Sequence, residues 1–114
     1  MNQEKFRRTV QHVVSLLENG AYGELENLSG GVRLSAEEMK EAIDGYGRKI
    51  TRFPEAGYEE LNVVKVRNSS PKQWSVNVPL FTEIEGRSDL TLSVTLVESE
   101  AQMYKVEIDD IHVL

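Results

Sequence analysis

Two short polar stretches combine residue types that can do chemistry. The first is EGRSDLTL, residues 85–92, and the second is DDIHVL, residues 109–114. The residues of interest are Arg87 and Asp89 in the first, and Asp109, Asp110 and His112 in the second. An arginine fork binds anions, and a histidine beside carboxylates can bind a metal ion or transfer a proton. These five residues form the candidate polar cluster of the chain.

A purely structural role explains the same residues. Gly86 supplies the geometry of a turn, Ser88 and Asp89 bond the turn backbone, and Arg87 pairs with Asp89, Asp109 or Asp110 through a forked hydrogen bond. Successive residues of a strand point to opposite faces, so Asp109 and Asp110 share a ligand only where a bulge reorients one of them. We expect neither a metal ion nor another cofactor, and both readings of the cluster stay open.

Catalysis finds little support in the residue types. The chain has no cysteine and only two histidines, of which His12 lies on the polar side of a predicted helix. No nucleophile, base and orienting group can be assembled from these residues. We therefore leave enzymatic activity open and favour a role without catalysis.

Size and charge bound the remaining functions. A chain of 114 residues, 39% hydrophobic and 28% charged, has the composition of one globular domain spanning residues 1–114. No stretch has the length or apolar character of a membrane span or a signal peptide, which predicts a cytoplasmic protein that binds no membrane. The net charge of -6 opposes nucleic-acid binding and favours a basic protein partner.

The elements that position the polar cluster begin with helices. Apolar residues at helical spacing predict a helix over 3–19, and Ser35 with Glu38 forms a capping box for a second helix over 36–46. Tyr22, Leu25 and Leu28 predict a turn or two of helix between them.

From residue 58 the apolar period changes from 3.6 to 2, which predicts strands near 59–67, 73–85, 89–98 and from 102 onward. Pro79 implies an edge position or a bulge, and the alternation slips by one after Asp109 and Asp110, which indicates another bulge. The predicted fold is α+β, with two N-terminal helices packed on a curved, mostly antiparallel four-stranded sheet.

Two hairpin registers keep the apolar residues on one face. In the first, Ile84 lies opposite Leu90; in the second, Leu96 lies opposite Tyr104. The second register would bring Asp110 opposite Leu90 and His112 level with Ser88. It therefore predicts that the two polar stretches meet.

Longer phrases carry a resemblance to known folds. VVSLLENGAYGELENL and YKVEIDDI resemble the opening helices and the last strand of nuclear-transport-factor-2-like, or cystatin-like, α+β domains. AIDGYG, EGRSDLTL and IDDIHVL resemble a family of small uncharacterised bacterial domains. The resemblance implies a cone-shaped fold in which Trp74 and Tyr104 line a cavity, although their inward positions equally suit a core.

Two functional hypotheses follow. The first is a non-catalytic binding protein, such as a bacterial immunity protein or inhibitor, whose partner surface is the acidic helix face of Glu37, Glu38 and Glu41, residues that we expect to be dispensable for folding. The second is a pocket protein or enzyme that binds a small molecule near Trp74 and Tyr104. An uncovered sheet face would favour a homodimer.

Overall fold

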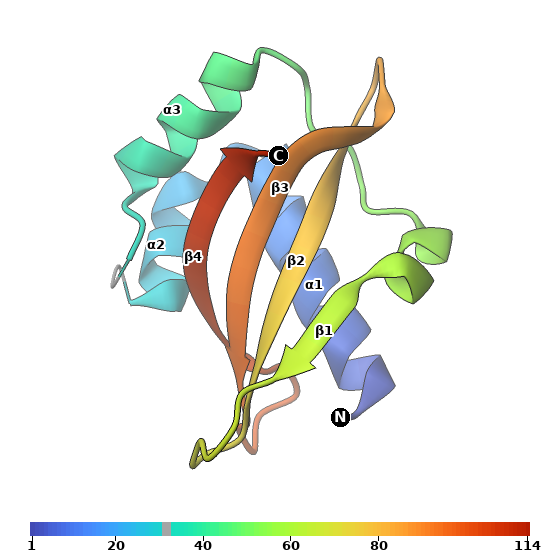
Figure 1. The fold of residues 1–114 in the computed structure, drawn as a ribbon. Helices are drawn as coiled ribbons and strands as arrows, with labels where there is room; N and C mark the ends of the chain where they lie inside the picture. Colours follow the sequence, from blue (N-terminus) through green and yellow to red (C-terminus); the bar gives the residue numbers. More distant parts are fainter. Residues whose placement is uncertain (31–32) are drawn as a thin grey trace.

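The computed structural model describes residues 1–30 and 33–114, and it shows an α+β fold with the helices on one face of a four-stranded sheet (Figure 1). The elements are α1 Gln3–Glu18, α2 Tyr22–Ser29, α3 Ala36–Tyr46, the 3-10 helix η1 Glu55–Glu60, β1 Asn62–Lys65, β2 Gln73–Thr82, β3 Gly86–Val97 and β4 Lys105–Val113. The predicted fold class is confirmed, with α2 as a third, short helix.

Side chains fix where the two longer helices begin. The Asn2 side chain accepts a hydrogen bond from the Lys5 amide (3.0 Å) and caps α1. At α3 the predicted capping box is confirmed, because Ser35 Oγ accepts from the Glu38 amide and Glu38 Oε1 accepts from the Ser35 amide, both at 3.1 Å. Together these bonds satisfy amides that a helix start leaves without a partner.

The sheet is an antiparallel meander in the order β1-β2-β3-β4. In Figure 1, α1 runs behind the sheet, and α2 and α3 lie beside β4. Alternate residues of β2, such as Val76, Val78 and Leu80, are buried against the helices, whereas Ser75 and Asn77 between them are exposed. The opposite face of the sheet is therefore exposed along β2, whereas Thr91 and Thr95 of β3 are buried on that face.

The register of the first hairpin differs from the prediction. Val78 pairs with Leu92, and Ile84 lies in the turn with 73% of its surface exposed. The hairpin closes at Thr82 and Gly86, because Thr82 Oγ1 accepts from the Glu85 amide (3.1 Å) and Gly86 takes a left-handed φ of 71°. The turn ends β2 before Ile84 can pair.

The second hairpin pairs Leu96 with Val106, two residues beyond the predicted partner Tyr104. The predicted bulge at the aspartates is confirmed: Val94 pairs with Ile108 and Ser93 with Asp110, so that Asp109 is the extra residue. The bulge predicted near Pro79 is also present, between Pro79 and Phe81.

The first strand is shorter than predicted because η1 occupies residues 55–60. Tyr58 of this helix packs edge to face on Phe53, with ring centroids 4.9 Å apart. Burying these rings binds η1 to the core and leaves Asn62 as the first residue of β1. Within the described ranges, none of the helices combines the length and apolar character needed to cross a membrane.

Candidate functional site

The face of β3 and β4 that lies opposite the helices carries most of the candidate polar cluster. Thr91 pairs with His112, and Ser93 pairs with Asp110. Asp109 lies on the same face, because its Oδ2 accepts a hydrogen bond from Thr95 Oγ1 (2.7 Å). The bulge thus turns two successive aspartates toward one side of the sheet, as the sharing of a ligand would require.

Asp109 is nevertheless engaged by the rest of the fold. Arg33, in the connection between α2 and α3, places Nη1 2.8 Å from Asp109 Oδ1 and Nη2 3.9 Å from Glu107 Oε1. The Asp109 side chain is only 18% exposed. Its Oδ1 atom makes no hydrogen bond among the described residues, so the contact with Arg33 is an ion pair without hydrogen-bond alignment. Asp109 therefore ties the helical layer to β4.

Asp110 and His112 form a more open pair. His112 Nδ1 lies 3.2 Å from Asp110 Oδ2, and the two side chains are 37% and 56% exposed. In the part of the chain that the structure describes, no group of three or more carboxylates and histidines could hold a metal ion. The geometry makes this pair a polar surface feature beside the Thr91 hydroxyl, which itself donates to the Asp89 carbonyl (3.3 Å).

Arg87 does not pair with Asp89, Asp109 or Asp110, so that prediction is wrong. Its Nη1 lies 2.9 Å from Glu60 Oε2 of η1. The observed register places Arg87 opposite Phe81, on the side of β3 that faces β2 and η1. Asp109 and Asp110 lie on the other side of β3, along β4.

The hydrogen bonds that the structure shows between the two polar stretches are backbone bonds. The Leu114 amide donates to the Asp89 carbonyl (3.0 Å), and His112 lies level with Thr91 rather than with Ser88. Ser88 does bond the backbone as expected, because its buried Oγ donates to the Leu80 carbonyl (2.7 Å) and accepts from the Leu90 amide (3.2 Å). The structural reading thus holds for Ser88.

The turn that precedes Ser88 is fixed to α3. Tyr46 donates its hydroxyl to Glu85 Oε2 (2.8 Å), and Glu85 Oε1 accepts from Thr82 Oγ1 (3.1 Å). The hydrogen bond to Glu85 raises the pKa of Tyr46, since it favours the protonated phenol. Glu85 therefore holds the hairpin turn against the helical layer.

Trp74 and Tyr104 lie in the core at one end of the sheet. Their rings pack edge to face with centroids 5.3 Å apart, and both residues are buried. Tyr104 also borders a surface hollow of about 360 Å³ with Leu28 and Met103, whereas Trp74 is not among the residues that line it.

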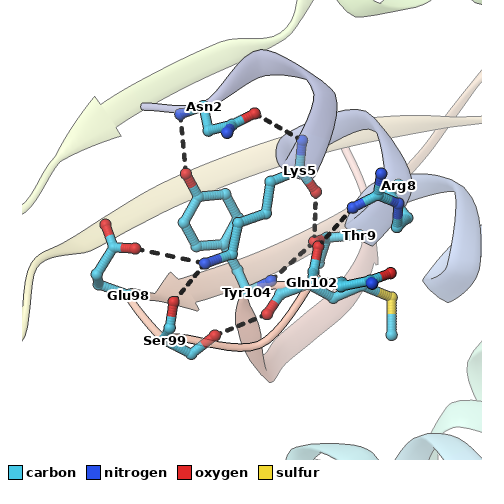
Figure 2. A network of polar contacts seen from close by, with 9 residues as sticks. Asn2, Lys5, Arg8, Thr9, Glu98, Ser99, Gln102 and Tyr104 are labelled. Atoms are coloured by element: carbon cyan, nitrogen blue, oxygen red, sulfur yellow. Dashed lines mark hydrogen bonds and ion pairs between the residues drawn. The ribbon is translucent and has the colours of Figure 1, made fainter.

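Figure 2 shows how Tyr104 is held by α1. Its hydroxyl accepts from the Asn2 amide and its amide donates to Thr9 Oγ1, both at 3.0 Å. Lys5 Nζ lies 4.6 Å from the centre of the Tyr104 ring, and it also contacts Glu98 and donates to the Ser99 carbonyl. We call this set of contacts the α1 clamp. The sequence gives no sign of it, because its partners are almost the whole chain apart.

A larger hollow of about 540 Å³ lies where α1 ends, α2 begins and α3 ends. Its walls include Leu17, Glu18, Tyr22, Ile43 and Asp44. Burial, and to a lesser degree Asp44, raises the pKa of Tyr22. Sequence reasoning missed this hollow, since it depends on how three helix ends meet.

The acidic residues of α3 divide into two kinds. Glu37 and Glu41 are exposed, and no lysine or arginine lies within 4.0 Å of either carboxylate in residues 1–30 and 33–114. Glu38 closes the capping box, and Asp44 pairs with Lys40 (2.5 Å). The expectation that all three glutamates are dispensable for folding therefore needs correction at Glu38.

Comparison with protein-family models gives a match over most of the chain. A family model described as "Domain of unknown function (DUF7668)" matches residues 14–114. No curated protein and no solved structure matches the chain significantly. The resemblance to the nuclear-transport-factor-2-like domains is therefore not tested by a solved relative.

Proposed function

This chain belongs to the DUF7668 family, which is described as a domain of unknown function, so we propose a role from the surface of the chain itself. We propose that the protein is a non-catalytic binding protein and that its partner is a basic protein. The proposed contact surface is the outward face of α3 around Glu37 and Glu41, with Glu38 at its edge. Opposite charge on the partner would steer the encounter and fix its orientation.

The observation that supports this proposal is that only some of the acidic residues of α3 make contacts within the fold. Glu38 and Asp44 contribute to the fold through the cap and the ion pair with Lys40. Glu37 and Glu41 serve no such role among the described residues, yet they stand one turn apart on an exposed helix face. Like charges at this spacing are mildly unfavourable in a helix, and a cationic partner would relieve the repulsion.

An inhibitor is the form of binding protein that suits these features best. A small acidic domain can cover a cationic site on a toxin or an enzyme, as immunity proteins do, and it needs no catalytic group of its own. We place this activity in the cytoplasm.

The test begins with affinity capture of partners from the source organism and mass spectrometry of the retained proteins. Association with a retained basic protein is then measured for the Glu37→Lys/Glu41→Lys variant. The matched control is Glu59→Lys/Glu100→Lys, which makes the same charge change at exposed positions outside α3. We expect the α3 variant to associate more slowly than the control, with the largest gap at low salt. Its melting temperature should fall only slightly, because Glu37→Lys places a cation in the first turn of α3.

Two results would overturn the proposal. One is that every specifically retained protein is acidic or neutral. The other is that the α3 variant and the control associate with the basic partner at equal rates at every salt concentration.

A second candidate function is small-molecule binding, and the hollow of about 540 Å³ at the three helix ends favours it. The Asn19→Trp variant would place a large ring at the exposed rim of this hollow. If the hollow binds a metabolite, a compound that raises the melting temperature of the parent protein should lose that effect in the variant. A compound that stabilises both proteins equally would exclude this hollow as its site.

A further inference from the structure

The connection between β1 and β2 has a charge opposite to that of the whole protein. Lys65, Arg67 and Lys72 lie within eight residues, and no acidic residue occurs between Glu60 and Glu83. The chain as a whole has a net charge of -6, so this segment is a local reversal of sign. At the level of sequence alone, these cations are spaced too irregularly to form a recognisable motif.

The structure leaves these three cations without carboxylate partners. Several other cations are paired, for example Arg33 with Asp109 and Arg87 with Glu60. No carboxylate of the described residues lies within 4.0 Å of Lys65, Arg67 or Lys72. All three side chains are exposed.

The cations surround a hollow rather than standing apart. The hollow has a volume of about 470 Å³, and its walls are Lys65, Val66, Arg67, Asn68, Ser69 and Lys72. Asn68 adds a side-chain amide, which donates hydrogen bonds as the cations do. The walls are therefore rich in donors and contain no carboxylate.

Hydrogen bonds brace the backbone that carries these side chains. Ser69 Oγ donates to the Val66 carbonyl and accepts from the Gln73 amide, both at 3.1 Å. The Val66 amide donates to the Gln73 carbonyl (2.9 Å), and the Lys72 carbonyl accepts from the Glu98 amide (2.8 Å). A braced loop loses less conformational freedom when it binds a ligand than a free loop does.

We propose that this hollow binds the phosphate or diphosphate group of a small ligand, and we name it the basic hollow. Three cations held around one space repel one another unless an anion enters, and a diphosphate offers enough oxygen atoms to contact all three. Arg67 matches phosphate oxygens in a forked geometry, while Lys65 and Lys72 act as point charges. This site lies outside α3, so it goes beyond the proposed partner surface.

The experiment uses the full chain, with inorganic pyrophosphate as the probe. Amide chemical shifts recorded by NMR during a titration should move in a saturable manner at Arg67, Asn68 and Ser69. The Arg67→Ala and Lys72→Ala variants should each bind about tenfold more weakly. The control variants Arg52→Ala and Lys105→Ala also remove exposed cations, but these lie outside the basic hollow, so binding should be unchanged. All four substitutions are at exposed positions, and the amide spectrum of each variant shows directly whether it is folded.

The other outcomes decide against the proposal. Shifts that do not saturate, or that sulfate produces equally, would show an adventitious ion only. Equal weakening by Arg67→Ala and by Arg52→Ala would show binding through net charge rather than through the hollow. The titration is repeated with nucleoside diphosphates, with a single-stranded oligonucleotide and with vesicles that contain anionic phospholipid. If the oligonucleotide or the vesicles bind more tightly than pyrophosphate and nucleoside diphosphates, the ligand is a macromolecule or a membrane and the proposal is wrong.

Discussion

Replacing Thr9 by valine should lower the free energy of unfolding although it hardly changes the volume of the side chain. Thr9 is 1% exposed, and its Oγ1 accepts from the Tyr104 amide (3.0 Å) and donates to the Lys5 carbonyl (2.7 Å). Valine fills the same space without the hydroxyl. The Tyr104 amide would then be buried without an acceptor at the centre of the α1 clamp.

The magnitude follows from which group loses its partner. A buried donor left without an acceptor costs about 1–3 kcal/mol. The Lys5 carbonyl contributes less, because it sits within α1 and can accept a backbone amide. We therefore expect Thr9→Val to cost about 1–3 kcal/mol, and for a domain of this size each kcal/mol lowers the melting temperature by roughly 4–6 °C.

The matched control is Thr9→Ser, which keeps the hydroxyl and removes one methyl group. Its cost should be about 0.8 kcal/mol, the value for one buried methylene or methyl group. Urea denaturation gives both free energies, and hydrogen exchange at the Tyr104 amide reports the bond itself. If the valine variant proves as stable as the parent, or more stable than the serine variant, the hydroxyl does not hold the clamp and the reasoning fails.

Three further predictions concern other parts of the core. Gly57→Ala should destabilise the protein by about 1–3 kcal/mol in urea denaturation, because a Cβ there would lie 2.7 Å from the Phe53 ring. The control Gly45→Ala should stabilise α3 by about 0.5–1 kcal/mol, because a Cβ there meets nothing within 4 Å. Equal effects of the two substitutions would contradict this prediction. Burial raises the pKa of Tyr58 above its ordinary value of 10.0, so the unfolded chain loses the phenol proton at lower pH than the folded protein does. The free energy of unfolding should therefore fall as the pH rises through 10. A Tyr58→Phe variant that loses as much stability over the same pH range would refute this prediction. Ser88→Ala should cost about 1–2 kcal/mol, since it strands a buried amide and a carbonyl; a thermal melt like that of the parent would count against this.

The sequence predicts which face of the sheet a residue occupies better than it predicts which residue lies opposite on the neighbouring strand. Both predicted registers place the apolar residues of β2, β3 and β4 inward, and the structure agrees for Val78, Leu92 and Val106. The register errors are four residues in the first hairpin and two in the second. An even error preserves the alternation, so the hydrophobic pattern cannot detect it. The turns decide instead: the bond from the Glu85 amide to Thr82 Oγ1 closes the first hairpin early.

The candidate polar cluster shows the same division. The bulge at Asp109 was readable from the slip in alternation, and it does turn both aspartates to one face. The partner of Arg87 was not readable, because Glu60 reaches it only after η1 packs through Tyr58 and Phe53. Arg33 reaches Asp109 for a similar reason, since the path of the chain between α2 and α3 brings it there. Contacts made by connections depend on the assembled core, and local pattern carries no information about them.

The two proposed surfaces should act independently of each other. In Figure 1, α3 and the connection between β1 and β2 lie at opposite ends of the sheet, in a molecule whose longest extent is 38 Å. At 0.15 M ionic strength the Debye length is about 8 Å, so charges at opposite ends of the sheet barely interact. Reversal of Glu37 and Glu41 should therefore leave pyrophosphate binding unchanged at this ionic strength. At about 0.01 M, where the Debye length grows to roughly 30 Å, removing negative charge should strengthen that binding. The acidic surface of α3 and the basic hollow can therefore act independently on one small domain, because the sheet between them is longer than the Debye length at 0.15 M ionic strength.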